Sequence, residues 1–220
     1  MATHADFQGF PADAILFFDE LEENNNREWF LQNRSRYDSL VRGPIDSFLM
    51  SVAAEFGTAH VFRPNRDTRF AHDKSPYKTN IGAICRSDAG AIYYIHFDGG
   101  GLMAASGHYM MSPDQIQRYR VAVADAKTGP QLSAIVDAAR ASGMALHEPE
   151  LKRVPSPFGQ DHPHGELLRL KSVTLSKQFG MPKWASTKSA QSKVVDVWRS
   201  AGPLNQWLAA HVGPSVAPQA

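Results

Sequence analysis

The sequence predicts an α+β fold, in which an antiparallel sheet of about five or six strands has N- and C-terminal helices packed on it. Three observations lead to this prediction. Apolar residues recur at helical spacing as far as Phe56. Short strand-like runs separated by turn residues follow, and helical spacing returns after Ser112. Because the links between the runs are short, neighbouring strands are expected to pair antiparallel.

The N-terminal part of the chain is expected to form three helices. The Asn24–Asn26 run ends the first, since asparagine tolerates a left-handed exit. Asn25, with a glutamate three residues later, is expected to cap the second. Gly43–Pro44 is expected to break that helix, and a third is predicted over about Pro44–Phe56.

The central part of the chain is expected to form the sheet. Its five strand-like runs are His60–Arg63, Arg66–Phe70, Asn80–Arg86, Ala91–Phe97 and Leu102–Met110. Both faces of the fourth run are largely apolar, which indicates a central strand. His96 shares a face of that strand with Tyr94 and is expected to be a hydrogen-bonded core histidine.

The C-terminal part returns to helices, with one more strand near Val173–Phe179. Ser112 and the three residues after it form a capping box with proline at the first helical position. Another helix is expected over Gln131–Ala141, stopped by Gly143. Without a linker or an internal repeat, we expect one domain over residues 1–212 and a loose tail over residues 213–220.

Composition excludes several classes of function. The net charge of +1 argues against a nucleic-acid partner. A single cysteine, Cys85, rules out an internal disulfide and sites with several thiolates, and it is expected to be a small buried hydrophobe. His162 and His164 lack a third ligand at telling spacing, so we expect no metal and no cofactor. With neither a signal peptide nor a membrane span, a cytoplasmic protein is expected.

The segment from Arg63 to Lys78 is the strongest candidate for a site. It holds five cationic residues against two aspartates, a local charge of +3. Two guanidinium groups about 5 Å apart repel by roughly 3 kcal/mol at an effective dielectric constant near 20. Converging side chains would therefore need an anion between them, supplied either by Asp67 and Asp73 or by a ligand.

The leading hypothesis is a small-molecule site for a phosphate or carboxylate group. Arg120 is added because the helical spacing puts it on the apolar face of its helix. The expected ligand-binding residues are Arg66, Arg69, Lys74, Tyr77, Lys78 and Arg120. Asp73 and His72 are the only acid or base candidates, and the sequence assigns no reaction.

Two other interpretations stay open. In the first, the same charges form a structural ion-pair network in a non-enzymatic interaction module, and the proline-rich stretch Glu148–Pro163 meets a protein partner that the sequence does not identify. In the second, the basic segment is a surface for nucleic acid or another macromolecule.

Several segments together resemble an uncharacterised bacterial and fungal family known as domain of unknown function 2461. They are Gly9–Pro11, the Asn-Asn run followed by Trp29-Phe30, the block Arg66–Thr79, Arg153–Pro155 and Asp161–Pro163. The resemblance covers nearly the whole chain. The resemblance implies that the chain forms one fold and that the block Arg66–Thr79 is important. It implies no reaction, because the family has none assigned.

Overall fold

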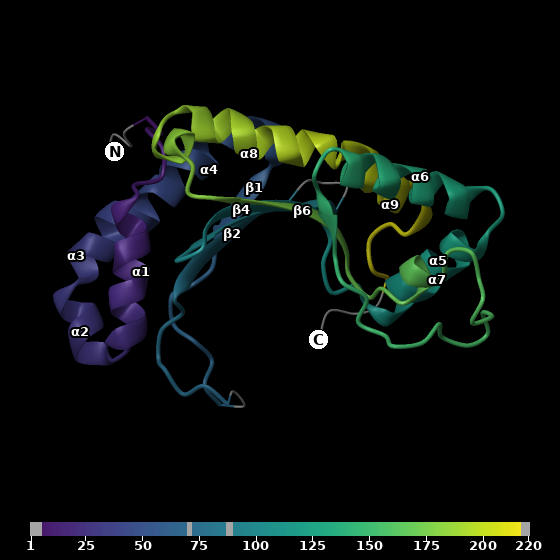
Figure 1. Ribbon diagram of the computed structural model, residues 1–220, viewed down its shortest axis with the longest axis horizontal. Coiled ribbons are helices and arrows are strands. Elements are labelled where there is room, and N and C mark those ends of the chain that lie inside the picture. Colours follow the sequence, from purple (N-terminus) through teal and green to yellow (C-terminus); the bar gives the residue numbers. More distant parts are fainter. Residues whose placement is uncertain (1–5, 70–71, 87–89, 217–220) are drawn as a thin grey trace. The chain divides into compact units, whose positions relative to one another are not determined.

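The computed structural model describes residues 6–69, 72–86 and 90–216, and it confirms the predicted α+β fold (Figure 1). The described residues form six strands of one antiparallel sheet, in the order β1-β2-β3-β4-β6-β5. The strands are β1 (Thr58–Val61), β2 (Asn80–Arg86), β3 (Ile92–Asp98), β4 (Gly101–His108), β5 (Ala145–Leu146) and β6 (Val173–Gly180). In the pairing of β5 with β6, Ala145 lies opposite Ser176.

The chain divides into two compact units. Unit 1 comprises Met1–Cys85, Tyr94–Ala104 and Gln178–Asp196, and unit 2 comprises Arg86–Tyr93, Ala105–Lys177 and Val197–Ala220. The five boundaries fall inside β2, β3, β4, β6 and the helix α8 (Ser189–Ser200) rather than in linkers. A single domain over residues 1–212 therefore stays a proposal, which one shared unfolding transition of both units would support.

The N-terminal helices of unit 1 depart from the prediction in three places, the first being that the expected second helix is divided at Asn33. They are α1 (Asp13–Glu23), α2 (Arg27–Gln32), α3 (Arg34–Tyr37), the π-helical turn η1 (Asp38–Arg42) and α4 (Gly43–Phe56). The expected break at Gly43–Pro44 is wrong, because proline lies in the first turn of α4, where its missing N–H is tolerated. The expected cap is also wrong: Asn26, not Asn25, accepts the N–H of Trp29, at 2.9 Å.

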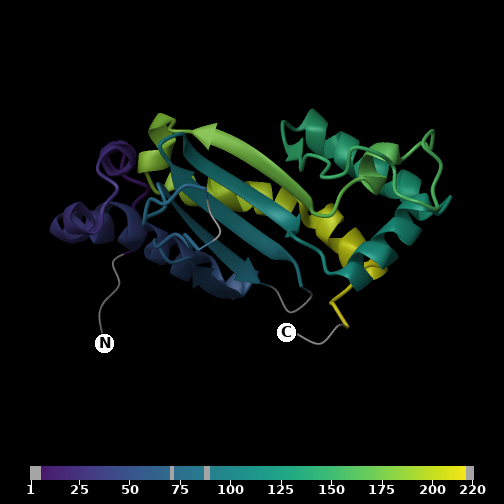
Figure 2. The ribbon, with the colours of Figure 1, turned by 90° about the horizontal axis from the view of Figure 1, so that it is seen from below.

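An aromatic cluster covers one face of β3 in unit 1. The ring of Phe97 lies 5.8 Å from that of Phe10 and 6.1 Å from that of Phe18, and Phe10 also contacts Phe48. Ile95, on the same strand face, is fully buried. Later in the chain the short helix η2 (Lys183–Ser186) leads to α8 (Ser189–Ser200), and Figure 2 shows the yellow-green α8 behind the blue and teal strands.

Unit 2 is built around buried aromatic residues of its helices. These helices are α5 (Pro113–Ala124), α6 (Thr128–Ala141), α7 (Gly165–Leu168) and α9 (Gly202–His211). The predicted capping box is confirmed at the start of α5. Tyr119 is fully buried and its hydroxyl donates to Leu167 O at 3.0 Å, while burial raises the pKa of the phenol. Trp198 and Trp207 are also buried.

Residues 213–216, the first part of the expected tail, are hydrogen-bonded to α5. The side chain of Gln115 donates to Gly213 O at 2.8 Å, and Arg118 donates to Pro214 O at 2.7 Å. The Val216 N–H donates to the Asp114 carboxylate at 2.9 Å. Residues 217–220 lie outside the described residues. Within the part of the chain that the structure describes, no helix is long and apolar enough to cross a membrane.

Candidate functional site

The described residues of the basic segment, Arg63–Arg69 and His72–Thr79, form the two arms of a hairpin, which we call the basic hairpin. Its two arms meet at an isolated bridge between Asn65 and Tyr77. The Arg66 N–H donates to Pro76 O and the Lys78 N–H to Pro64 O, both at 2.8 Å. The expected strand over Arg66–Phe70 is wrong for its described residues, because Asp67 accepts the Arg69 N–H at 3.2 Å and turns the backbone.

Two of the three arginines expected to bind an external anion, Arg66 and Arg69, are each paired with an aspartate of the hairpin. Arg66 Nη1 lies 2.7 Å from the Asp73 carboxylate. Arg69 forms a bidentate pair with Asp67, at 3.0 Å through Nε and 2.7 Å through Nη2. The Arg69 side chain is 77% exposed, whereas that of Arg66 is 29% exposed. Arg66 is therefore the more enclosed of the two cations.

The two lysines of the basic hairpin bind backbone carbonyls rather than carboxylates. Lys74 Nζ donates to Thr68 O at 2.9 Å, and Lys78 Nζ donates to Arg63 O at 3.2 Å. A neutral carbonyl does not cancel an ammonium charge, so the lysines and the exposed Arg63 keep the charge of +3.

The acid and base candidates lie on the same hairpin. The Ser75 backbone N–H, donated to Asp73 at 2.9 Å, holds the pKa of that carboxyl below its usual value, and Arg66 lowers it further. Asp73 is therefore ionised at neutral pH and can act there only as a base. His72 is exposed.

Tyr77 is buried, and its aromatic ring stacks on that of Phe30, with centroids 3.9 Å apart and an interplanar angle of 11°. It therefore packs the hairpin against α2. Arg120 belongs to unit 2, where α5 leaves it half-buried. Burial lowers the pKa of its guanidinium, and its buried Nε has no hydrogen-bond partner among the described residues.

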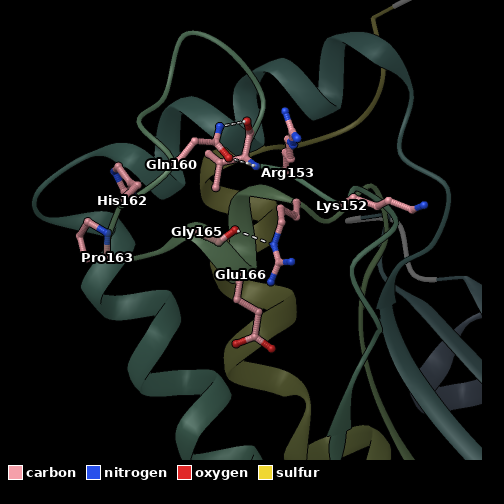
Figure 3. A pocket seen from close by; sticks show the side chains of 9 residues that line it. Lys152, Arg153, Gln160, His162, Pro163, Gly165 and Glu166 are labelled. Carbon is pink, nitrogen blue, oxygen red and sulfur yellow. Dashed lines mark hydrogen bonds between the residues drawn. The ribbon is translucent and has the colours of Figure 1, made fainter.

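A cavity of about 300 Å³ opens in unit 2, beside α7 (Figure 3). We call it the α7 cavity, and its lining is Lys152, Arg153, Val154, Gln160, His162, Pro163, Gly165, Glu166 and Arg169. The Gln160 side chain shapes its wall by accepting from Val154 N at 3.3 Å and donating to Val154 O at 2.7 Å. Arg169 Nε donates to Gly165 O at 3.3 Å, which fixes that arginine against the helix.

The charges around the α7 cavity are mostly positive. Lys152, Arg153 and Arg169 contribute cations, and the single carboxylate, Glu166, forms an ion pair with Arg140 outside the lining. In Figure 3, Lys152 and Arg153 extend from one side of the cavity, while His162 lies at the other. Such a lining can attract a phosphate or a carboxylate.

Sequence reasoning missed the α7 cavity as a binding site. It treated the Glu148–Pro163 stretch only as a possible contact for a partner, and it did not consider Arg169. The available signal was the adjacent pair Lys152-Arg153 inside a proline-rich loop, since loops held by a rigid scaffold often bind ligands. Among the described residues, no group of three or more His, Cys, Asp or Glu side chains could hold a metal ion.

The fold places the chain among α+β proteins built on an antiparallel sheet. More specifically, the chain belongs to the family described as conserved hypothetical protein (DUF2461), whose model matches residues 13–207. This confirms the resemblance seen in the sequence. Comparisons with curated proteins and with solved structures gave no match.

Proposed function

We propose that the protein binds a small molecule carrying a phosphate or carboxylate group in the α7 cavity. The observation that carries this proposal is the charge of the lining, in which three cationic side chains accompany one carboxylate that Arg140 already neutralises. The volume of about 300 Å³ is at the lower end of the range typical of small-molecule sites. A ligand about the size of a sugar phosphate fits this space.

Arg169 and Arg153 are the proposed anion-binding groups. A guanidinium has five N–H donors in a planar fork, and among the described residues Arg169 uses only its Nε donor, which bonds to Gly165 O. Its remaining donors suit a bidentate contact with two oxygens of the ligand. Support also comes from the residues that carry the family resemblance, because Arg153, Val154, His162 and Pro163 all line this cavity.

Isothermal titration tests the proposal with inorganic phosphate, a sugar phosphate, a dicarboxylate and the matching uncharged sugar. We expect the charged compounds to bind and the uncharged sugar not to bind. Losing a hydrogen-bonded charge pair costs roughly 1.5–3 kcal/mol, so Arg169→Ala and Arg153→Ala are each expected to weaken binding by about 10- to 100-fold. Lys127→Ala, an exposed cation outside the cavity, is the matched control. Unchanged affinity in both arginine variants would reject the cavity.

The basic hairpin is a second candidate, favoured by the Arg66–Asp73 pair at 2.7 Å. We infer that this pair and Tyr77 hold the hairpin in shape, while Arg69, Lys74 and Lys78 present its residual positive charge to an anionic partner. The same titrations separate the two candidates. If Lys74→Ala and Lys78→Ala lose phosphate binding while the cavity variants keep it, the ligand binds the basic hairpin rather than the α7 cavity.

A further inference from the structure

Three polar side chains alternate along one face of β3. Tyr94, His96 and Asp98 lie two residues apart, so they point to the same side of the strand. The intervening residues Ile95 and Phe97 are buried on the opposite side. The polar face is more open: the side chain of His96 is 18% exposed and that of Asp98 is 37% exposed.

These side chains form a continuous hydrogen-bonded chain. The Tyr94 hydroxyl lies 2.9 Å from His96 Nδ1, and His96 Nε2 lies 3.0 Å from Asp98 Oδ2. The other carboxylate oxygen, Oδ1, accepts the Gly100 N–H at 2.8 Å. Asp98 is therefore held at both oxygens, one by the β3–β4 turn and one by the imidazole.

The direction of the chain follows from donor and acceptor chemistry. An ionised carboxylate only accepts hydrogen bonds, so His96 Nε2 carries the hydrogen that bonds to Asp98. Nδ1 of the neutral imidazole is then an acceptor, and the Tyr94 hydroxyl donates to it. The phenol proton thus already points at a base, and the carboxylate behind that base can stabilise an imidazolium.

The position of the phenol depends on a neighbouring glycine. A Cβ added at Gly82 would lie 2.8 Å from the Tyr94 hydroxyl and 3.2 Å from the ring of Phe62. Only a residue without a side chain leaves the hydroxyl where it reaches His96. The hydrogen-bonded chain is therefore set by β2 as well as by β3.

We propose that Tyr94, His96 and Asp98 form a reactive site in which Tyr94 is a nucleophile toward an uncharged acyl compound. The Tyr94 oxygen forms a bond to the acyl carbon, and the leaving group departs with the electron pair of the bond that breaks. The phenol proton passes to His96 Nδ1, and Asp98 stabilises the resulting imidazolium. The three residues carry one negative charge in total, which disfavours an anionic substrate. This site lies in unit 1 and does not rest on the function proposed for the α7 cavity.

The test is acylation of the whole protein by 4-nitrophenyl acetate, followed by mass spectrometry of the modified peptides. Acyl transfer to Tyr94 releases 4-nitrophenolate, which is also followed optically. Because general-base catalysis contributes ~100-fold or more, His96→Gln is expected to slow acylation of Tyr94 about 100-fold. Asp98→Asn is expected to slow it less, and the singly charged 4-nitrophenyl succinate is expected to react more slowly than the acetate.

Tyr109 provides an internal control in the same sample, since it is 57% exposed and its acylation should be the same in all variants. Thermal melts check that each variant is folded, and Asp98→Asn keeps the test informative if His96→Gln does not fold. Tyr94→Phe should abolish the adduct assigned to that residue. Absence of acylation at Tyr94 under conditions that modify Tyr109, or equal rates in the wild type and the folded variants, would overturn the proposal.

Discussion

The side-chain amide of Asn25 pairs with both backbone polar groups of Tyr77. Its Oδ1 accepts the Tyr77 N–H at 3.0 Å and its Nδ2 donates to Tyr77 O at 2.9 Å. The amide thus takes the place that a neighbouring strand would occupy beside Tyr77. Together with the stacking of Tyr77 on Phe30, this joins the basic hairpin to the loop before α2.

Asn25→Ala should destabilise the protein, because it leaves buried backbone groups of Tyr77 without that partner. We expect the free energy of unfolding in urea to fall by ~1–3 kcal/mol. Asn24→Ala is the matched control: the Asn24 side chain is exposed and, among the described residues, bonds only to Glu20 O of its own helix, so a change of under about 0.5 kcal/mol is expected. Equal losses in the two variants would contradict the role of Asn25.

Arg66 and Arg69 should differ in their effect on stability. Arg66 is enclosed, paired with Asp73 and in contact with Tyr77 O, whereas Arg69 pairs with Asp67 in the open. Exposed ion pairs contribute little because water and salt screen them. We expect Arg66→Ala to lower the Tm by several degrees and Arg69→Ala to leave it nearly unchanged. A larger loss of Tm in Arg69→Ala than in Arg66→Ala would indicate that the exposed Arg69–Asp67 pair contributes more to stability than the enclosed pair.

Local sequence signals predicted much of the fold. The capping box at Ser112, the strand over Asn80–Arg86 and the stop at Gly143 are confirmed, because each depends on neighbouring residues. Cys85 is buried as expected, and burial raises the pKa of its thiol to about 11. The role of Asn25 could not be predicted in this way, since its partner lies 52 residues further along the chain.

The candidate sites were less predictable for the same reason. The charge of the basic hairpin was visible in the sequence, but its pairing with Asp67 and Asp73 depends on how the turn folds. His96 was correctly expected to be hydrogen-bonded, yet its chain to Tyr94 and Asp98 also needs the space above Gly82 on another strand. The sequence predicts which side chains share one face of a strand, but it does not predict which residue of the neighbouring strand lies beside them.

Gly101→Ala should be strongly destabilising. At Gly101 the backbone φ is +98°, and an added Cβ would lie 2.2 Å from the carbonyl carbon of Gly180. Gly90 has a similar φ of +86°, but a Cβ there meets none of the described residues within 4 Å. We expect a loss of ~1–2 kcal/mol for Gly90→Ala, from backbone strain alone, and at least ~3 kcal/mol for Gly101→Ala. Denaturant melts measure both, and similar losses would show that the contact with Gly180 can relax.

Acid sensitivity should come in part from His108 on β4. The side chain is buried, its Nδ1 has no hydrogen-bond partner among the described residues, and burial lowers the pKa of the imidazole. Below about pH 6.5 the unfolded chain therefore binds a proton that the folded protein does not. The free energy of unfolding should then decrease as the pH falls below that value, by at most ~1.4 kcal/mol per pH unit.

Replacing His108 separates this contribution from the others. His164, whose pKa is lowered by burial and by His162, contributes with the same sign but is less buried. Because glutamine cannot be protonated in this range, His108→Gln should reduce the pH dependence of the free energy of unfolding between pH 6.5 and 5. The contribution of His164 should remain, so the pH dependence should not be abolished. Urea melts at intervals of half a pH unit measure the slope in both proteins. An unchanged slope in His108→Gln would mean that the buried imidazole gains its proton without unfolding.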